Sequence, residues 1–265
     1  MTQPLLHHRT KTSLENYLTL PTHGLILAGP EGSGKYFLAL WLAKQLSAEN
    51  FTLESADQKN SITIDQIRDL YGITRTGSSL TIIVKDAQQM GREAQNAFLK
   101  LLEEPPQNTR FILTTNKLTS LLPTIRSRSQ AIEVLPPPAA DLLSYATKHT
   151  SIPSTELKSL LHTSRGLPGT FMNLLLVDSS REAHLAAVKL AKQFYGADPY
   201  NRHLLCVQYK FEKEWASQLL DLLSIILQSL MKHNVNNVTM LKKIQSQAEL
   251  LETTATNLLT INGNP

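Results

Sequence analysis

The stretch that decides the fold is Gly29-Pro30-Glu31-Gly32-Ser33-Gly34-Lys35-Tyr36. The apolar run before it, at 25–28, predicts a buried strand, and residues 36–46 after it have the apolar spacing of a helix. A glycine-rich turn in this position binds phosphate groups, because backbone amides and the helix N-terminus point at the anion. We therefore predict a phosphate-binding loop in which Lys35 reaches the terminal phosphates. The motif has Ser or Thr at its last position to bind Mg²⁺, but Tyr36 stands there, and its hydroxyl lies too far from the backbone to replace it.

Further apolar runs alternate with helical spacing along the first half of the chain. The runs at 80–84, 110–115 and 131–135 predict strands, and the spacing at 61–71 and 91–102 predicts helices. The second of these helices ends before Pro105 and Pro106, since proline cannot continue the hydrogen-bond ladder. The alternation predicts an α/β domain with a parallel sheet that is covered on both faces.

The prolines Pro136, Pro137 and Pro138 break this pattern and predict a linker. Beyond them we expect three short helices, at 141–149, 154–164 and 168–176, and helical spacing resumes from Arg181 to the C-terminus. The sequence thus predicts an α/β domain at 1–135, a three-helix domain at 136–180 and an all-α domain at 181–265.

Composition excludes several classes of protein. The 265 residues are 42% hydrophobic, which is ordinary for a globular protein. The single cysteine, Cys206, excludes an intramolecular disulfide and a cysteine-based zinc site. No apolar run approaches the ~20 residues that cross a bilayer, and the N-terminus lacks the pattern of a secretory signal, so we expect a cytoplasmic protein with no membrane partner. A net charge of +4 is compatible with a polyanionic partner but decides nothing alone.

Between residues 24 and 134, four further blocks resemble a known family in order, spacing and content. They are Ile64-Asp-Gln-Ile-Arg-Asp-Leu70, Ala94-Gln-Asn-Ala-Phe-Leu-Lys-Leu-Leu-Glu-Glu-Pro-Pro106, Phe111-Ile-Leu-Thr-Thr-Asn116 and Leu121-Leu-Pro-Thr-Ile-Arg-Ser-Arg-Ser-Gln130. With the phosphate loop, or Walker A motif, they are similar to the clamp-loader subunits of bacterial DNA polymerase III, which belong to the AAA+ class of P-loop proteins. The resemblance implies a AAA+ domain, then a three-helix lid and a helical domain like the family's collar.

The resemblance also assigns the metal-binding positions. In the family the strand at 80–84 ends in the Walker B acids, which places the magnesium-binding Asp at Lys85 and the catalytic Glu at Asp86. Asn116 matches the sensor-1 residue, and a strand-end Asn that caps a turn is the alternative. Because hydrolysis depends on a positioned Mg²⁺, Tyr36 and Lys85 predict a degenerate, disabled site; a sluggish ATPase that tolerates both is the other interpretation.

Ser127-Arg128-Ser129 matches the family's Ser-Arg-Cys motif, with serine in place of cysteine. In the family this arginine is the finger that enters the ATP site of the neighbouring subunit. The resemblance therefore implies that role for Arg128, with Arg126 as the second candidate. A planar, permanently charged guanidinium suits the task, because it can stabilise charge on a departing γ-phosphate.

The segment Ser164-Arg-Gly-Leu-Pro-Gly-Thr170 resembles the lid of the delta-prime subunits. ATP-hydrolysing relatives carry a sensor-2 arginine near Gly169, where this chain has no basic residue. Many relatives also carry a four-cysteine zinc module where this chain has only residues 47–62, without cysteine. We expect no zinc, no other metal and no required cofactor, while the sequence leaves open whether the loop still holds a nucleotide.

The resemblance as a whole implies a stator-like subunit without activity of its own in a DNA polymerase holoenzyme. Its partners would be gamma/tau-like ATPase subunits and delta in a hetero-oligomeric ring, with the sliding clamp and primed DNA reached through the complex. Two alternatives stay open. One is an ATP-hydrolysing motor subunit or other AAA+ ATPase, and the other is a nucleic-acid-binding protein that reuses the fold, against which the lack of a basic cluster argues.

Overall fold

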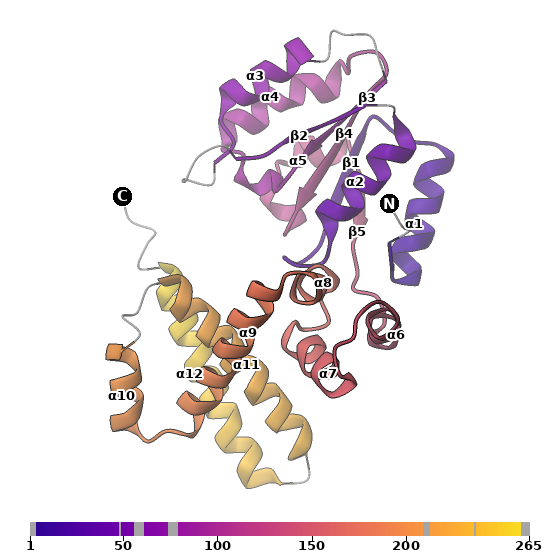
Figure 1. Ribbon diagram of the computed structural model, residues 1–265. Helices are drawn as coiled ribbons and strands as arrows, with labels where there is room; N and C mark the ends of the chain where they lie inside the picture. The colour runs from indigo at the N-terminus through magenta and orange to yellow at the C-terminus, as the bar shows by residue number, and fades with distance from the viewer. Residues whose placement is uncertain are drawn as a thin grey trace. The chain divides into compact units, whose positions relative to one another are not determined.

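The computed structural model describes residues 4–47, 49–55, 61–73, 79–208, 213–235 and 237–260. The chain divides into two compact units, Met1–Met172 and Asn173–Pro265. The first contains the sheet and the second is helical, as the ribbon in Figure 1 shows. The three domain boundaries expected from the sequence stay a prediction. None of the described helices is both long and apolar enough to span a lipid bilayer.

A five-stranded sheet in the order β2-β3-β4-β1-β5 forms the centre of the first unit. Its strands are β1 (Gly24–Ala28), β2 (Glu49–Leu53), β3 (Leu80–Val84), β4 (Thr109–Thr115) and β5 (Gln130–Glu133). Every strand pair is parallel, which confirms the predicted α/β fold. In a parallel sheet the carboxyl ends of the strands share one edge and the amino ends share the other.

Helices cover both faces of this sheet (Figure 1). They are α1 (His8–Thr19), α2 (Lys35–Leu46), α3 (Ile64–Ile73) and α4 (Arg92–Glu103). Strand side chains alternate between the faces, so Ile26 of β1 packs in the core with α3 and α4, whereas Leu25 and Leu27 pack in the core with α1 and α2. On the first face the rings of Phe98 and Phe111 meet edge to face, 5.3 Å apart.

Strand β2 and helix α1 of the first unit were not predicted. Strand β2 lies in a polar segment of the sequence and is the outermost strand of the sheet, next to β3 alone. Glu49 and Asn50 are exposed there, and of its five residues only Leu53 is buried. Helix α1 is anchored by Thr10, whose hydroxyl donates to the Glu133 carbonyl and accepts from the Leu135 amide, both at 3.0 Å.

Short turns η2 (Ala87–Gln89) and η3 (Leu118–Ser120) and helix α5 (Pro123–Ser127) connect the later strands, and none of these three was predicted either. The three short helices expected after the prolines are α6 (Ala139–His149), α7 (Ser154–Thr163) and α8 (Pro168–Leu176). The second unit contains α9 (Asp178–Gly196), α10 (Pro199–Gln208), α11 (Lys213–His233) and α12 (Val238–Thr260). Helices α9 and α11 form one core cluster of this unit, with Val188, Ala191, Leu219, Leu222, Leu223 and Ile225 buried in it. Leu205 of α10 and Ile244 of α12 are also buried.

Ser129, in the family's cysteine position, offers a test of the packing at the start of β5. Its Oγ is buried, has no hydrogen-bond partner among the described residues and lies so close to β1 that a Cβ on Gly24 would meet it at 2.8 Å. We expect Ser129→Ala to leave the free energy of unfolding unchanged or to raise it by up to about 1 kcal/mol, because it removes a buried hydroxyl without a partner.

The matched control is Ser164→Ala, since the buried Ser164 hydroxyl donates to the Leu161 carbonyl at 2.9 Å. Its expected loss is about 1 kcal/mol. Urea denaturation, followed by the fluorescence of Trp41 in a Trp215→Phe background, measures both. Equal losses in the two variants would contradict the assignment of Ser129 as unpaired.

Candidate functional site

The phosphate loop lies at the carboxyl edge of the sheet, between β1 and α2. The Gly29 amide donates to the Thr115 carbonyl at 3.1 Å and ties the loop to the end of β4. Gly32 and Gly34 have φ values of 77° and 83°, in the left-handed region that favours glycine. The loop therefore has the backbone for which its glycines are required.

Lys35, the first residue of α2, is only 6% exposed, and its ammonium group is fully used inside the chain. Nζ donates to the carbonyls of Gly29 and Pro30, both at 2.8 Å, and to Asn116 Oδ1 at 3.0 Å. Three bonds exhaust the donors of a lysine. Burial lowers the pKa of Lys35, and the negative charges of Asp86 and Glu31 oppose that shift. A phosphate could bind the Lys35 ammonium only by displacing one or more of these three acceptors.

A short hydrogen-bonded chain joins the ends of β3 and β4 beside this lysine. The backbone N–H of Asn116 donates to Gln88 Oε1, and Gln88 Nε2 donates to Asp86 Oδ1, each at 3.2 Å. Asp86 itself has a left-handed backbone, with φ 52° and ψ 54°, and its amide donates to Thr114 Oγ1 at 2.9 Å. Asn116 thus lies where the sequence predicted. Gln88 was missed, because a glutamine in a turn belongs to no motif.

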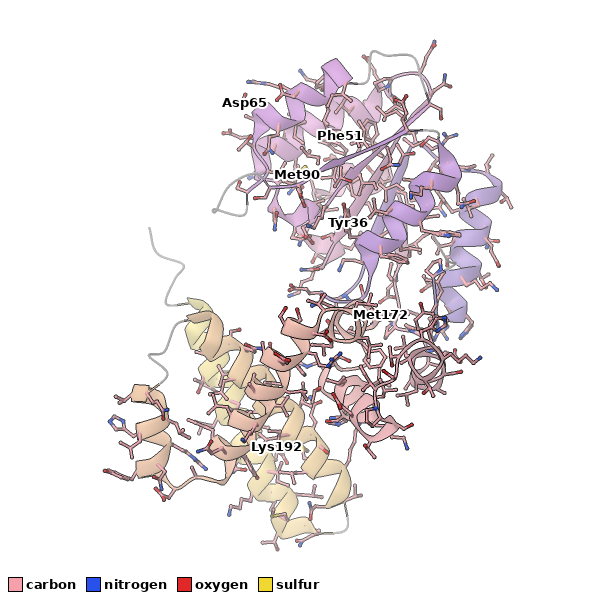
Figure 2. All side chains as sticks on the ribbon, viewed as in Figure 1. Tyr36, Phe51, Asp65, Met90, Met172 and Lys192 are labelled. Carbon is pink, nitrogen blue, oxygen red and sulfur yellow. The ribbon has the colours of Figure 1, made fainter. Side chains whose placement is uncertain are left out.

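Lys85 follows β3 at the position where the family has a magnesium-binding Asp. Its side chain forms an ion pair with Glu54. Nζ lies 2.7 Å from Glu54 Oε2 and 5.2 Å from the ring centroid of Tyr36, which is on the first turn of α2 (Figure 2). The hydrogen bond to Glu54 raises the pKa of Lys85, with burial acting in the opposite direction. The two residues that replace the metal ligands therefore contact each other, and Glu54 is a partner that no sequence motif indicates.

This arrangement does not fit Mg²⁺. The ion takes hard oxygen ligands in near-octahedral geometry, and here an ammonium group and the face of a phenol ring occupy the two ligand positions. Of the two positions that match the Walker B acids, only Asp86 carries a carboxylate. In the part of the chain that the structure describes, no group of three or more His, Cys, Asp and Glu side chains could hold a metal ion.

The N-terminus of α8 rests on the apex of the phosphate loop. The amides of Gly169 and Thr170 both donate to the Gly32 carbonyl, at 2.7 and 3.3 Å. A Cβ on Gly169 would lie 2.8 Å from that oxygen, which is closer than real Cβ atoms come, and 3.1 Å from the Gly34 nitrogen, which is a tight contact. The absence of a side chain at the sensor-2 position is thus what allows this contact.

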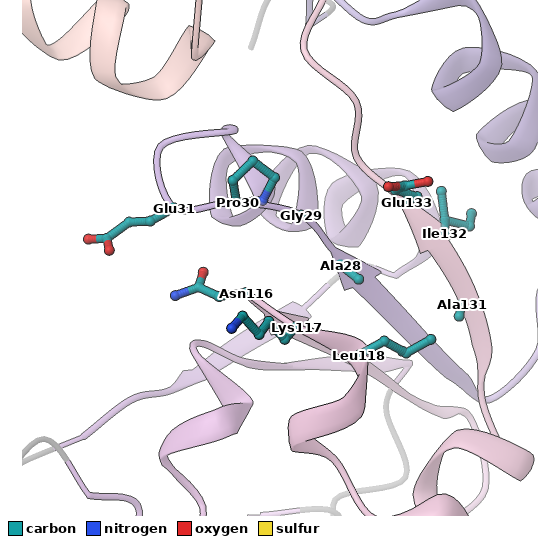
Figure 3. Close-up of a pocket in the computed structure, with 10 residues that line it drawn as sticks. All are labelled: Ala28, Gly29, Pro30, Glu31, Asn116, Lys117, Leu118, Ala131, Ile132 and Glu133. Carbon is teal, nitrogen blue, oxygen red and sulfur yellow. The ribbon is translucent and has the colours of Figure 1, made fainter. Parts of the chain in front are cut away.

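A pocket of about 690 Å³ opens beside the loop (Figure 3). It is lined by Ala28, Gly29, Pro30, Glu31, Asn116, Lys117, Leu118, Ala131, Ile132 and Glu133. It shares Gly29, Pro30 and Glu31 with the loop, but Lys35 does not line it. The pocket therefore lies between the start of the phosphate loop, β5 and the turn after β4.

Arg128 lies at the opposite edge of the sheet. It caps α5 just before β5, and its carbonyl is close to the first residue of β1, where a Cβ on Gly24 would meet it at 3.2 Å. The five residues of β1 separate it from the phosphate loop by about 16 Å. Its side chain is 38% exposed and lies 2.9 Å from Glu103, whereas the half-buried Arg126 has its Nε covered. The structure therefore brings the predicted site residues together except for Arg128.

The chain is similar to known replication proteins. The family described as "DNA polymerase III, delta subunit" matches residues 47–138. DNA polymerase III subunit delta' of Pseudomonas aeruginosa is 32% identical over 210 residues, which cover 67% of this chain and 64% of that protein. Subunit delta' of Escherichia coli is 30% identical over 155 residues, covering 57% and 46%. The chain thus spans less than two thirds of the length of either relative.

Among solved structures, a DNA polymerase III gamma subunit-related protein of Thermotoga maritima has a TM-score of 0.56 at 21% identity, over 96% of this chain and 98% of that one. At this identity the likeness concerns the fold alone, and it confirms the AAA+ architecture expected from the sequence. The fold and the delta' relatives agree with the motifs, and the chain belongs to the family of the DNA polymerase III delta' subunits.

Proposed function

We propose that the chain is a non-hydrolysing, stator-like subunit of the DNA polymerase III clamp loader that donates Arg128 to the ATP site of a neighbouring subunit. The observation that carries the proposal is the position of Arg128. It lies at the amino edge of the sheet, about 16 Å of strand away from a phosphate loop at the carboxyl edge, so it cannot serve that loop. An exposed arginine at the opposite edge is available to another subunit.

The guanidinium of Arg128 suits a phosphate of the neighbour. It is charged at every physiological pH, and its planar fork can donate two parallel hydrogen bonds to phosphate oxygens. In the proposed role it places positive charge beside the γ-phosphate as that group departs, which is where an arginine finger lowers the barrier.

The loop of this chain is proposed to hold no nucleotide. Lys35 donates all three of its hydrogen bonds within the chain, and Lys85 is held by Glu54. The α8 amides already bind the Gly32 carbonyl. The retained glycines and Lys35 favour the alternative, an ATP-hydrolysing subunit, but that function would require the Lys85–Glu54 pair to be harmless.

The proposed partners are gamma/tau-like ATPase subunits and delta, and the sliding clamp and primed DNA are reached through the assembled ring. The four helices of the second unit are proposed to serve as the oligomerisation collar. That role rests on analogy with the family, because a fold alone does not establish a function.

The isolated chain is expected to show no Mg²⁺-dependent ATP turnover above background. The reason is that Tyr36 and Lys85 supply no metal ligand, and hydrolysis relies on the charge and geometry of that ion. Phosphate release measured for the wild type and for Lys35→Ala should be equal. A wild-type rate that falls in Lys35→Ala would establish the alternative instead.

Arg128→Ala is expected to slow ATP hydrolysis at the one neighbouring site that faces this chain by about 10³-fold, the usual range for loss of an arginine finger. The measurement is single-turnover hydrolysis by the ATPase subunits, reconstituted with this chain, delta, clamp and primed DNA. Arg126→Ala is the matched control, because this second arginine is two residues away and half-buried. The assignment fails if the two variants exchange these behaviours or if neither slows the reaction.

Gly169→Ala is expected to lower the free energy of unfolding by about 1–3 kcal/mol, because its Cβ would overlap the Gly32 carbonyl. Gly72→Ala is the control, because no atom of the described residues outside its own helix and chain neighbours lies within 4 Å of the added Cβ. Alanine in a helix should raise stability by about 0.5–1 kcal/mol. Urea denaturation compares them. A neutral Gly169→Ala would show that α8 does not press on the loop in solution.

A further inference from the structure

We propose that Glu103 is a positioning residue that restrains Arg128 and competes with the neighbour's phosphate for its guanidinium. The inference rests on the proposed function of Arg128 as a finger. It adds a second residue of this chain to that function and states how it acts. Removal of the Glu103 charge should make the finger easier to engage.

The contacts of Arg128 show an arginine that is folded back onto its own unit. Nη2 lies 2.9 Å from Glu103 Oε1, and Nη1 donates to the Thr124 carbonyl at 3.2 Å and, more weakly, to Ser127 Oγ at 3.4 Å. Both terminal nitrogens are therefore engaged. A guanidinium has five N–H groups, and these contacts use two or three of them. They hold the fork against Glu103 and α5, so a bidentate bond to a phosphate in trans competes with this arrangement.

The position of Glu103 is unusual for an acid. It is the last residue of α4, where the unpaired carbonyls give the helix a partial negative charge that disfavours a carboxylate. Glu104 follows as the C-cap, so two acids stand together at this end. The helix dipole therefore disfavours the Glu103 carboxylate, whereas the ion pair with Arg128 stabilises it.

The strength of the pair suits a restraint that can be released. The two side chains are 38% and 49% exposed, and ion pairs this accessible shift an equilibrium by at most about fivefold. A phosphate in a water-excluded site offers a more highly charged partner, with which the arginine can form two bonds. Arg128 can therefore leave Glu103 for the neighbour's nucleotide, and the pair imposes a modest competition.

The experiment uses Glu103→Gln in the reconstituted clamp loader. The amide retains an oxygen that can accept from Nη2 and removes the negative charge. We expect the single-turnover rate of hydrolysis at ATP concentrations below saturation to rise about two- to fivefold. The gain should shrink as ionic strength increases from about 0.05 to about 0.3 M, because salt screens exposed charges.

Glu104→Gln is the matched control. It makes the same change of net charge one residue away, at an exposed position whose carboxylate is not the one bound to Arg128, and it should leave the rate unchanged. In the double variant Glu103→Gln, Arg128→Ala, the rate should equal that of Arg128→Ala alone. Thermal unfolding of each variant, expected to match the wild type closely, separates a change of rate from a loss of fold.

The outcomes separate this inference from the proposed function. If Arg128→Ala abolishes the stimulated hydrolysis but Glu103→Gln equals the wild type or is slower, the finger stands and the restraint by Glu103 is wrong. If Arg128→Ala has no effect, the finger itself is wrong, and the restraint falls with it. A gain of equal size in Glu104→Gln would assign the effect to general charge and would also overturn the role of Glu103.

Discussion

The whole arrangement of sites depends on one constraint: all strands of the described sheet run in the same direction. Loops that follow strands gather at one edge, and segments that precede strands gather at the other. The phosphate loop, Lys85 and Asn116 follow β1, β3 and β4, so they meet. Arg128 precedes β5 and is held away from them. A single sheet thereby places the phosphate loop at one edge and Arg128 at the other.

At the carboxyl edge, groups of the chain itself bind the ammonium groups of Lys35 and Lys85. The Lys35 ammonium is bound by carbonyls of its own loop, and the Lys85 ammonium is bound by Glu54. Buried or half-buried charges are costly unless paired, so a site that loses its metal and phosphate gains from such internal pairs. At the same edge the Gly169 and Thr170 amides of α8 bind the Gly32 carbonyl, so the loop is held by contacts within the chain.

The α/β fold and the phosphate loop could be predicted from the sequence, because the patterns that indicate them each lie within a short stretch of the chain. The glycines of the phosphate loop, the apolar runs of the central strands and the prolines after α4 each indicate structure within a few residues. The edge strand β2 was missed, since a strand with one neighbour buries little and carries a weak pattern. Glu54, Gln88 and Glu103 were missed for a different reason. Their partners are distant in the sequence or belong to no motif, and only the folded sheet brings them within bonding distance.

The pairing of Lys85 with Glu54 also makes a single substitution of Lys85 by an acid unfavourable. A change of Lys85 alone to an acid would not recreate a magnesium site, because Glu54 would lose its counterion and face a second carboxylate at short range. Tyr36 would also lose the ammonium beside its ring and would still offer no hydroxyl at the metal position. The three side chains depend on one another, and no single substitution among them supplies a complete set of oxygen ligands for Mg²⁺.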